Sequence, residues 1–199
     1  MMLIEETAVP QAALPVDEFK SHLRLGTGFS DGDVQDVLLE SYLRAAIAAI
    51  EARTGKILIV RSFSWTLTRW REPDVQSLPV APVSEITSLV LRNRVDEEET
   101  IDPSFYWLEA DSQRPLLRAS GSCFPAVPPG GVAEIRFTAG YAPDWAGLPS
   151  DLGQAVNLLA AHYYEHRHET RLGDTQMPFG VANLIERYRT VRLFTGGSV

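Results

Sequence analysis

The hydrophobic positions change their spacing twice along the chain, and these changes divide it into three zones. Apolar residues recur at helical spacing over 1–56, alternate with polar residues over much of 57–145, and return to helical spacing over 146–199. We therefore expect N-terminal helices, a small β domain, and C-terminal helices followed by a flexible tail. The predicted fold class is α+β, in which the two helical zones form one bundle and a small antiparallel β domain is inserted between them.

The first zone predicts a short helix over 17–25 and a long helix after the polar run 30–33. That run is typical of an N-cap with an acid three residues later, and Thr54-Gly55 predicts the end of the long helix. The long helix is apolar on two sides and must be buried by neighbours, in its own chain or in another. One side carries Val34, Val37, Leu38, Tyr42, Ala45, Ala46 and Ala49. For the other side we expect an interface between copies, formed by Leu39, Leu43, Ile47 and Ile50.

The middle zone predicts several short strands. The first covers 57–70, with Phe63, Trp65 and Leu67 on one face and hydroxyl side chains on the other. A charged turn is expected at 96–99. Further strands are predicted at 86–92, 105–109, 116–118 and 132–138. Such spacing indicates a small antiparallel sheet or barrel.

The last zone predicts a helix that starts near Pro149, with Ser150 as its N-cap. A loop is expected over 173–180, and a second amphipathic helix follows it. The apolar stripe of that helix comprises Val181, Leu184, Ile185, Tyr188 and Val191.

Composition removes several classes of protein from consideration. The 199 residues carry a formal net charge of −8, whereas a tight DNA-binding protein usually presents a basic face. One cysteine, Cys123, allows no intrachain disulfide. No segment approaches the roughly 18 apolar residues that a membrane span needs. The acidic N-terminus lacks the basic region of a secretory signal, so we expect synthesis in the bacterial cytoplasm and no membrane partner.

One short motif could carry chemistry. His162, Glu165 and His166 match the HxxEH pattern, in which two histidines one helical turn apart bind zinc and the glutamate acts as base. A zinc hydrolase also needs a third protein ligand, and Glu186 is the one later acid expected on a helix. We therefore predict a helix with surface histidines, no catalytic residue, no metal and no cofactor. His162 and His166 remain the alternative metal ligands.

A second alternative is a nucleic-acid-binding module. Four tryptophans, Trp65, Trp70, Trp107 and Trp145, lie in or beside the β zone and could stack on bases. A groove for single strands should be basic, whereas this zone is acidic, so core or interface positions are expected for them.

An ordered series of segments over roughly 14–192 resembles the head–tail connector, or adaptor, family of tailed phages, in its branch with a β insertion. The family includes proteins of siphophages, prophages and gene transfer agents. The segments are LPVDEFKSHLRL at 14–25, Glu51 with TGK at 54–56, FSWTL at 63–67, LPVAPV at 78–83, FTAGY at 137–141, AHYYEHR at 161–167 and PFGV at 178–181. Within this resemblance, the HxxEH string is part of a structural helix.

The resemblance implies a non-enzymatic virion subunit at the head–tail junction of a phage or phage-like particle. Its relatives form a ring, typically of twelve copies, between the portal protein and a stopper or tail-completion protein. Packaged double-stranded DNA passes through the lumen, so the expected contact with DNA is proximity without sequence specificity. We further expect the C-terminal segment to bind the portal, through Tyr188, Arg189, Arg192, Leu193 and Phe194.

Overall fold

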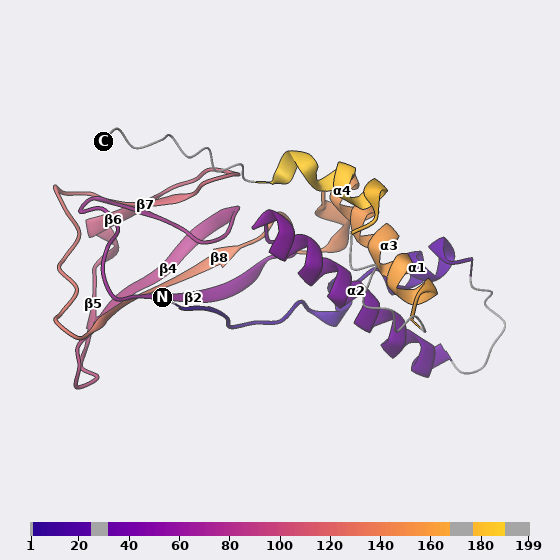
Figure 1. The fold of residues 1–199 in the computed structure, drawn as a ribbon. Coiled ribbons are helices and arrows are strands. Elements are labelled where there is room, and N and C mark those ends of the chain that lie inside the picture. The colour runs from indigo at the N-terminus through magenta and orange to yellow at the C-terminus, as the bar shows by residue number, and fades with distance from the viewer. Residues whose placement is uncertain (1, 25–31, 168–176, 190–199) are drawn as a thin grey trace.

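The computed structural model describes residues 2–24, 32–167 and 177–189. Helices gather at one end of an elongated molecule and strands at the other (Figure 1). The helices are α1 (Val16–His22), α2 (Gly32–Thr54), α3 (Ser150–Glu165) and α4 (Phe179–Ile185). Short 3-10 helices cover Gln11–Ala13, Pro103–Phe105, Trp145–Gly147 and Glu186–Tyr188. The fold is mixed α+β, as the change of hydrophobic spacing predicts.

The strands form two antiparallel sheets. The larger sheet has the order β1-β2-β8-β4-β5, and the smaller has the order β3-β7-β6. In the larger sheet the strands are β1 (Met2–Glu5), β2 (Arg61–Leu67), β4 (Val83–Arg92), β5 (Glu98–Thr100) and β8 (Val132–Ala139). In the smaller they are β3 (Val75–Ser77), β6 (Tyr106–Glu109) and β7 (Leu116–Ala119).

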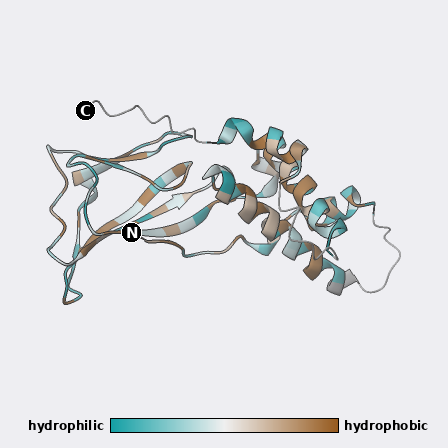
Figure 2. Cartoon of the chain, in the orientation of Figure 1, coloured by the Kyte–Doolittle hydropathy of each residue, from teal (hydrophilic) through white to brown (hydrophobic). Residues whose placement is uncertain are grey.

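Two hydrophobic cores correspond to the two ends of the molecule. The helical core takes Phe19 from α1 and Leu159 from α3, together with side chains of α2 and α4. The β core takes Phe63 from β2, Phe137 from β8 and Leu117 from β7, so both sheets contribute to it. Figure 2 shows hydrophobic and hydrophilic residues interleaved along the helices and strands, which is the pattern of elements buried on one side.

The strand predicted over 57–70 is too long. β2 begins at Arg61, because the apolar run before it crosses from the helices to the sheet and bonds elsewhere. The Ile57 N–H donates to the Ala81 carbonyl at 2.8 Å, and the Val60 N–H donates to the Ala142 carbonyl at 2.8 Å. Within β2, Phe63, Trp65 and Leu67 are all buried as predicted, but Ser64 on the opposite face is buried too, so the alternation is confirmed only in part.

The predicted helix ends have mixed outcomes. Gly55, at a φ of 70°, ends α2 as expected. Ser150 is not an N-cap, because it is the first helical residue of α3 and Pro149 occupies the cap without a side-chain bond. α1 ends at His22, short of the predicted 25. The polar run 30–33 and the loop 173–180 fall partly outside the described residues.

Candidate functional site

The inner side of α2 belongs to the chain's own core. Leu39, Leu43, Ile47 and Ile50 are at most 1% exposed, because α1 and α3 pack against α2 in the helical core. We predicted these four residues at a ring interface, but in this fold they have no surface to offer a neighbouring copy. The other side of α2 has such a surface, since Val37 and Leu38 are 67% and 42% exposed. A ring interface on α2 stays a prediction, and these two side chains are the ones available for it.

The expected portal-binding residues divide into three groups. Tyr188 is buried, and its hydroxyl donates to Asp151 Oδ1 of α3 at 2.7 Å. Arg189 is exposed and pairs with Glu186 at 2.9 Å. Arg192, Leu193 and Phe194 lie outside the described residues. Tyr188 therefore fixes the end of α4 to α3, and Arg189 is the expected portal contact that lies on the described surface.

A buried ion pair joins α2 to the larger sheet. Arg61 Nη2 of β2 lies 2.6 Å from Glu51 Oε2, and the two side chains are 4% and 10% exposed. The other carboxylate oxygen accepts the Leu58 N–H at 2.8 Å. Burial raises the pKa of the Glu51 carboxyl, while Arg61 and the Leu58 N–H oppose that shift. Glu5 of β1 also approaches Arg61, at 3.4 Å, so the pair holds three elements together.

The Thr54-Gly55-Lys56 motif makes a second connection at the same helix end. Thr54 donates its hydroxyl to the Ile50 carbonyl at 2.8 Å, and its oxygen accepts the Lys56 N–H at 3.1 Å. The Lys56 side chain is fully buried and donates to the Gln113 carbonyl at 3.1 Å, in the loop before β7. Burial lowers the pKa of Lys56, and Asp111 opposes that effect. The end of α2 is thus tied to both sheets.

The two histidines of the HxxEH string lie on one side of α3. Their ring centroids are 4.2 Å apart, and a ring nitrogen of His166 lies 2.9 Å from the His162 carbonyl. Within the described ranges, no three His, Cys, Asp or Glu side chains lie close enough together to hold a metal ion. No described helix is both long and apolar enough to cross a bilayer.

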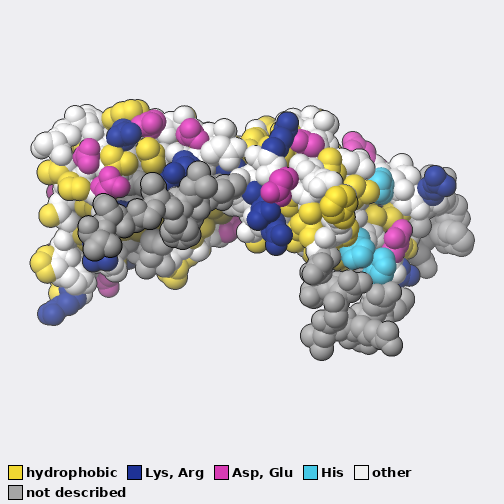
Figure 3. Space-filling view, turned by 45° about the horizontal axis from the view of Figure 1, so that its top comes forward, with side chains coloured by type: hydrophobic (Ala, Val, Ile, Leu, Met, Phe, Trp, Pro, Cys, Tyr) yellow, Lys and Arg dark blue, Asp and Glu magenta, His cyan; other side chains and the backbone are white. Residues whose placement is uncertain are grey.

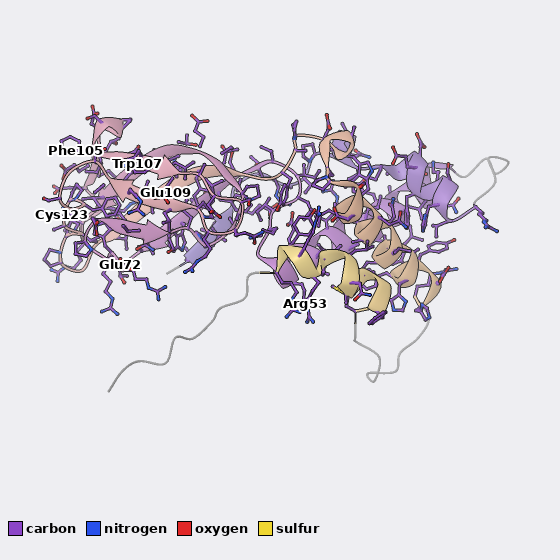
Figure 4. All side chains as sticks on the ribbon, turned by 90° about the horizontal axis from the view of Figure 1, so that it is seen from above. Arg53, Glu72, Phe105, Trp107, Glu109 and Cys123 are labelled. Carbon is purple, nitrogen blue, oxygen red and sulfur yellow. The ribbon has the colours of Figure 1, made fainter. Side chains whose placement is uncertain are left out.

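Three of the four tryptophans have structural partners. Trp65 is buried in the β core, Trp70 donates its indole N–H to the Pro125 carbonyl at 2.8 Å, and Trp145 donates to Glu18 at 3.1 Å. Trp107 on β6 is 48% exposed, and Phe105 nearby is 59% exposed. Figure 4 shows both on the β6 side of the smaller sheet. Trp65 holds the core position expected for tryptophan, and an interface position for Trp107 stays a prediction.

Large hydrophobic side chains are exposed at several separated places. They are Met2, Leu3 and Ile4 on β1, Val37 and Leu38 on α2, Val95 after β4, Phe105 and Trp107 near β6, and Phe179 on α4. In Figure 3 hydrophobic patches alternate with charged groups along the whole face in view. Hydrophobic spacing in the sequence did not indicate that β1, Val95 or Phe179 would be exposed. An apolar residue within a charged turn, as at Val95, is the signal that would have identified one of them.

Solved structures provide the comparison with known proteins. One chain, from the neck of an empty gene transfer agent particle computed with C6 symmetry, is 54% identical, with a TM-score of 0.89. A second, from the virion of a native gene transfer agent particle, is 53% identical, with a TM-score of 0.86. A third, from the neck of a native particle computed with C12 symmetry, is 50% identical, with a TM-score of 0.85.

Each of these similarities covers 98% of this chain and 99% of the other. No protein-family model and no curated protein matches. Identity of this order over almost the whole length shows that the chain shares a family with these neck and virion chains. The chain belongs to the head–tail connector family, in the branch found in the necks of gene transfer agent particles.

Proposed function

We propose that the chain is the subunit of a twelve-membered ring at the head–tail junction of a gene transfer agent-like particle. The observation that supports this proposal most strongly is the 50–54% identity, over 98% of the chain, to chains from such particles. Two of the related structures were computed with C6 and C12 symmetry, and twelve copies satisfy both. The ring would join the portal on one side to a stopper or tail-completion protein on the other.

The distribution of exposed apolar residues supports assembly. A cyclic ring uses a heterologous interface, in which one patch of each copy meets a different patch of the next. The described surface carries such patches on α2, β1 and β6, well separated along the molecule (Figure 1). We propose that the helices of the two termini act as one bundle within each copy, since Leu43, Leu159 and Ile185 share one core.

We propose a structural role without catalysis, in which double-stranded DNA passes through the ring. The related chains are components of virion and neck, which supports that role. A net charge of −8 favours passage of DNA without tight binding, because phosphates are repelled by an acidic wall. Portal contact is proposed for Arg189 and the following residues 190–194, with Tyr188 holding their starting point on α3.

Deletion of the coding gene in a producing strain, followed by electron microscopy of purified particles, tests this function. We expect DNA-filled or empty heads without attached tails, and recovery of tailed particles when the gene is supplied in trans. Particles with complete necks from the deletion strain would contradict the proposal. Subtomogram or single-particle averages of the complemented particles should show twelve copies between the portal and the tail.

A further inference from the structure

A groove of about 750 Å³ lies where the chain leaves β2 and turns toward β3. Its lining is mixed. Trp65, Leu67 and Leu78 supply apolar side chains that are 3%, 3% and 8% exposed, and Thr68, Gln76 and Ser77 supply polar ones. Its rim carries the exposed Arg69 and Arg71, and no acidic residue lines it. The groove therefore combines an apolar surface with two positive charges, on a chain that is acidic as a whole.

Neighbouring acids are directed to another cation. Glu72 and Asp74 follow Arg71 in the chain, and both raise the pKa of the Arg118 guanidinium on β7 by their charge. Arg118 also pairs with Glu109 of β6. Arg69 and Arg71 also line an adjoining shallow pocket with Glu72, whereas the groove itself carries the two arginines and no acid.

The turn between β4 and β5 has the opposite character. Asn93 Oδ1 accepts the N–H groups of Val95 and Glu97 at 2.9 and 3.0 Å, and this fixes the shape of the turn. Val95 at the tip is 69% exposed, although it is apolar, and Asp96 beside it is exposed with a φ of 61°. The side chain of Arg94 lies against Gly130. The tip therefore displays Val95 and Asp96, with Glu97 beside them accepting a hydrogen bond from the Asn93 side-chain amide at 2.7 Å.

The strand register places the groove and the tip at the same level of the sheet. Leu67 at the end of β2 and Leu91 near the end of β4 both pair with Ala133 of β8, from opposite sides. β1 pairs with β2 from Phe63 to Thr66, so it lies beside Trp65 of the groove but does not pair with Leu67 or the residues after it. Figure 1 shows β5 at the end of the molecule away from the helices. In a ring, opposite sides of adjacent copies meet at matching levels.

We infer that the β4–β5 tip of one copy docks in the groove of the next copy around the ring. Val95 covers the apolar part of the lining, while Asp96 and Glu97 pair with Arg69 and Arg71. Apolar contact with matched charge at the rim is the usual composition of a specific interface, and the charges also fix which surfaces meet. The inference rests on the proposed ring, which supplies the second copy.

Thiol cross-linking in assembled particles tests the contact. The single cysteine is first removed by Cys123→Ser, and Thr68→Cys at the groove and Val95→Cys at the tip are then combined. After treatment of purified particles with a short bis-maleimide, we expect a ladder of covalent multimers under denaturing conditions. Each cysteine alone should give no ladder, because a heterologous contact needs both. Arg53→Cys combined with Thr68→Cys is the matched control and should also give none, because Arg53 is an exposed residue of α2 outside the proposed contact.

Necks that contain the doubly substituted chain but yield no multimers would overturn the inference and leave the proposed ring intact. Absence of the unsubstituted chain from purified necks would instead overturn the proposed function. The two failures are therefore distinguishable within one experiment.

Charge reversal provides an independent test. Arg69→Glu with Arg71→Glu should lower the amount of chain in purified necks by about tenfold or more, through repulsion of the facing acids. Adding Asp96→Lys with Glu97→Lys should restore it. Arg53→Glu, an exposed change on α2 (Figure 4), should have no effect. Normal assembly of the double-arginine variant, or no recovery in the fourfold variant, would overturn the inference.

Discussion

At the scale of single residues, the family motifs mark places where polar or backbone geometry is demanding. The Glu51 side chain is 10% exposed, on the side of α2 that also carries the buried Ile47 and Ile50, and it is there because Arg61 and the Leu58 N–H need an acceptor. Gly140 adopts a φ of 145° against the backbone of Val60. Both residues appear in the segments that resemble the family, but the sequence alone showed neither the partner of Glu51 nor the neighbour of Gly140.

Replacement of Arg61 should show how much a buried Glu51 carboxylate without a counter-charge lowers the free energy of unfolding. Arg61→Met leaves a buried carboxylate without its counter-charge, and we expect the free energy of unfolding to fall by about 3 kcal/mol or more at neutral pH. The loss of Arg61 raises the folded-state pKa of Glu51 further above its unfolded value. Stability is then lost as pH rises between those two values, so acidification should return part of it.

Urea denaturation at several pH values measures this effect. Arg136→Met is the matched control, because Arg136 pairs with Glu134 on the sheet with 56% of its side chain exposed, and exposed pairs contribute about 1 kcal/mol or less. Equal losses in the two variants would contradict a special role for the buried pair.

Gly140 gives a second prediction at this scale. A Cβ at this position would lie 2.5 Å from the Val60 Cα, so Gly140→Ala should lower the free energy of unfolding by about 2 kcal/mol or more. Gly121→Ala is the control, since nothing lies within 4 Å of its added Cβ. Thermal unfolding of both variants distinguishes them, and similar midpoints would show that the backbone near Val60 gives way.

At the scale of elements, hydrophobic spacing located the helices and most strands but not the roles of their faces. The two apolar sides of α2 were visible in the sequence, yet the side richer in large aliphatic residues proved to be internal. Sequence spacing shows that a face is apolar. It does not show which elements pack against that face, here α1 and α3. β1, β3 and β5 were missed: β1 has no alternation of apolar and polar residues, β3 has three residues, and β5 begins inside the charged turn predicted at 96–99.

The exposed side of α2 yields a prediction about assembly. Val37→Asp with Leu38→Asp should leave the fold intact, because both side chains are exposed, but should reduce incorporation into particle necks if α2 contacts a neighbour. Circular dichroism checks the fold, and the chain content of purified necks checks incorporation. Leu39→Asp serves as contrast and should unfold the chain, since that side chain is fully buried.

The contact between α4 and α3 can be tested through Tyr188. Tyr188→Phe removes the hydroxyl that donates to Asp151, and we expect a loss of about 1 kcal/mol in unfolding free energy. If this bond positions the portal-binding segment, portal binding should weaken while the ring still forms. A pull-down with portal protein measures the first effect, and electron microscopy the second. Unchanged binding would remove Tyr188 from the proposed portal contact.

At the scale of the whole molecule, two cores meet at one helix end, where Glu51 and Lys56 reach the two sheets. We therefore expect unfolding to be a single cooperative event. Tryptophan fluorescence, which reports chiefly on the β part through Trp65, Trp70 and Trp107, should change together with helical circular dichroism during denaturation. Separate transitions in the unsubstituted chain would show that the two cores are independent.

The tie at the end of α2 has a mechanical consequence for a particle under internal pressure. Force applied to the strands by a neighbouring copy reaches the helices through short bonds buried from water, not through a slack linker. A force on one end of the subunit is then transmitted to the other end with little bending between the two parts. In the proposed ring, each copy would therefore resist bending, and the neck would tilt as one piece.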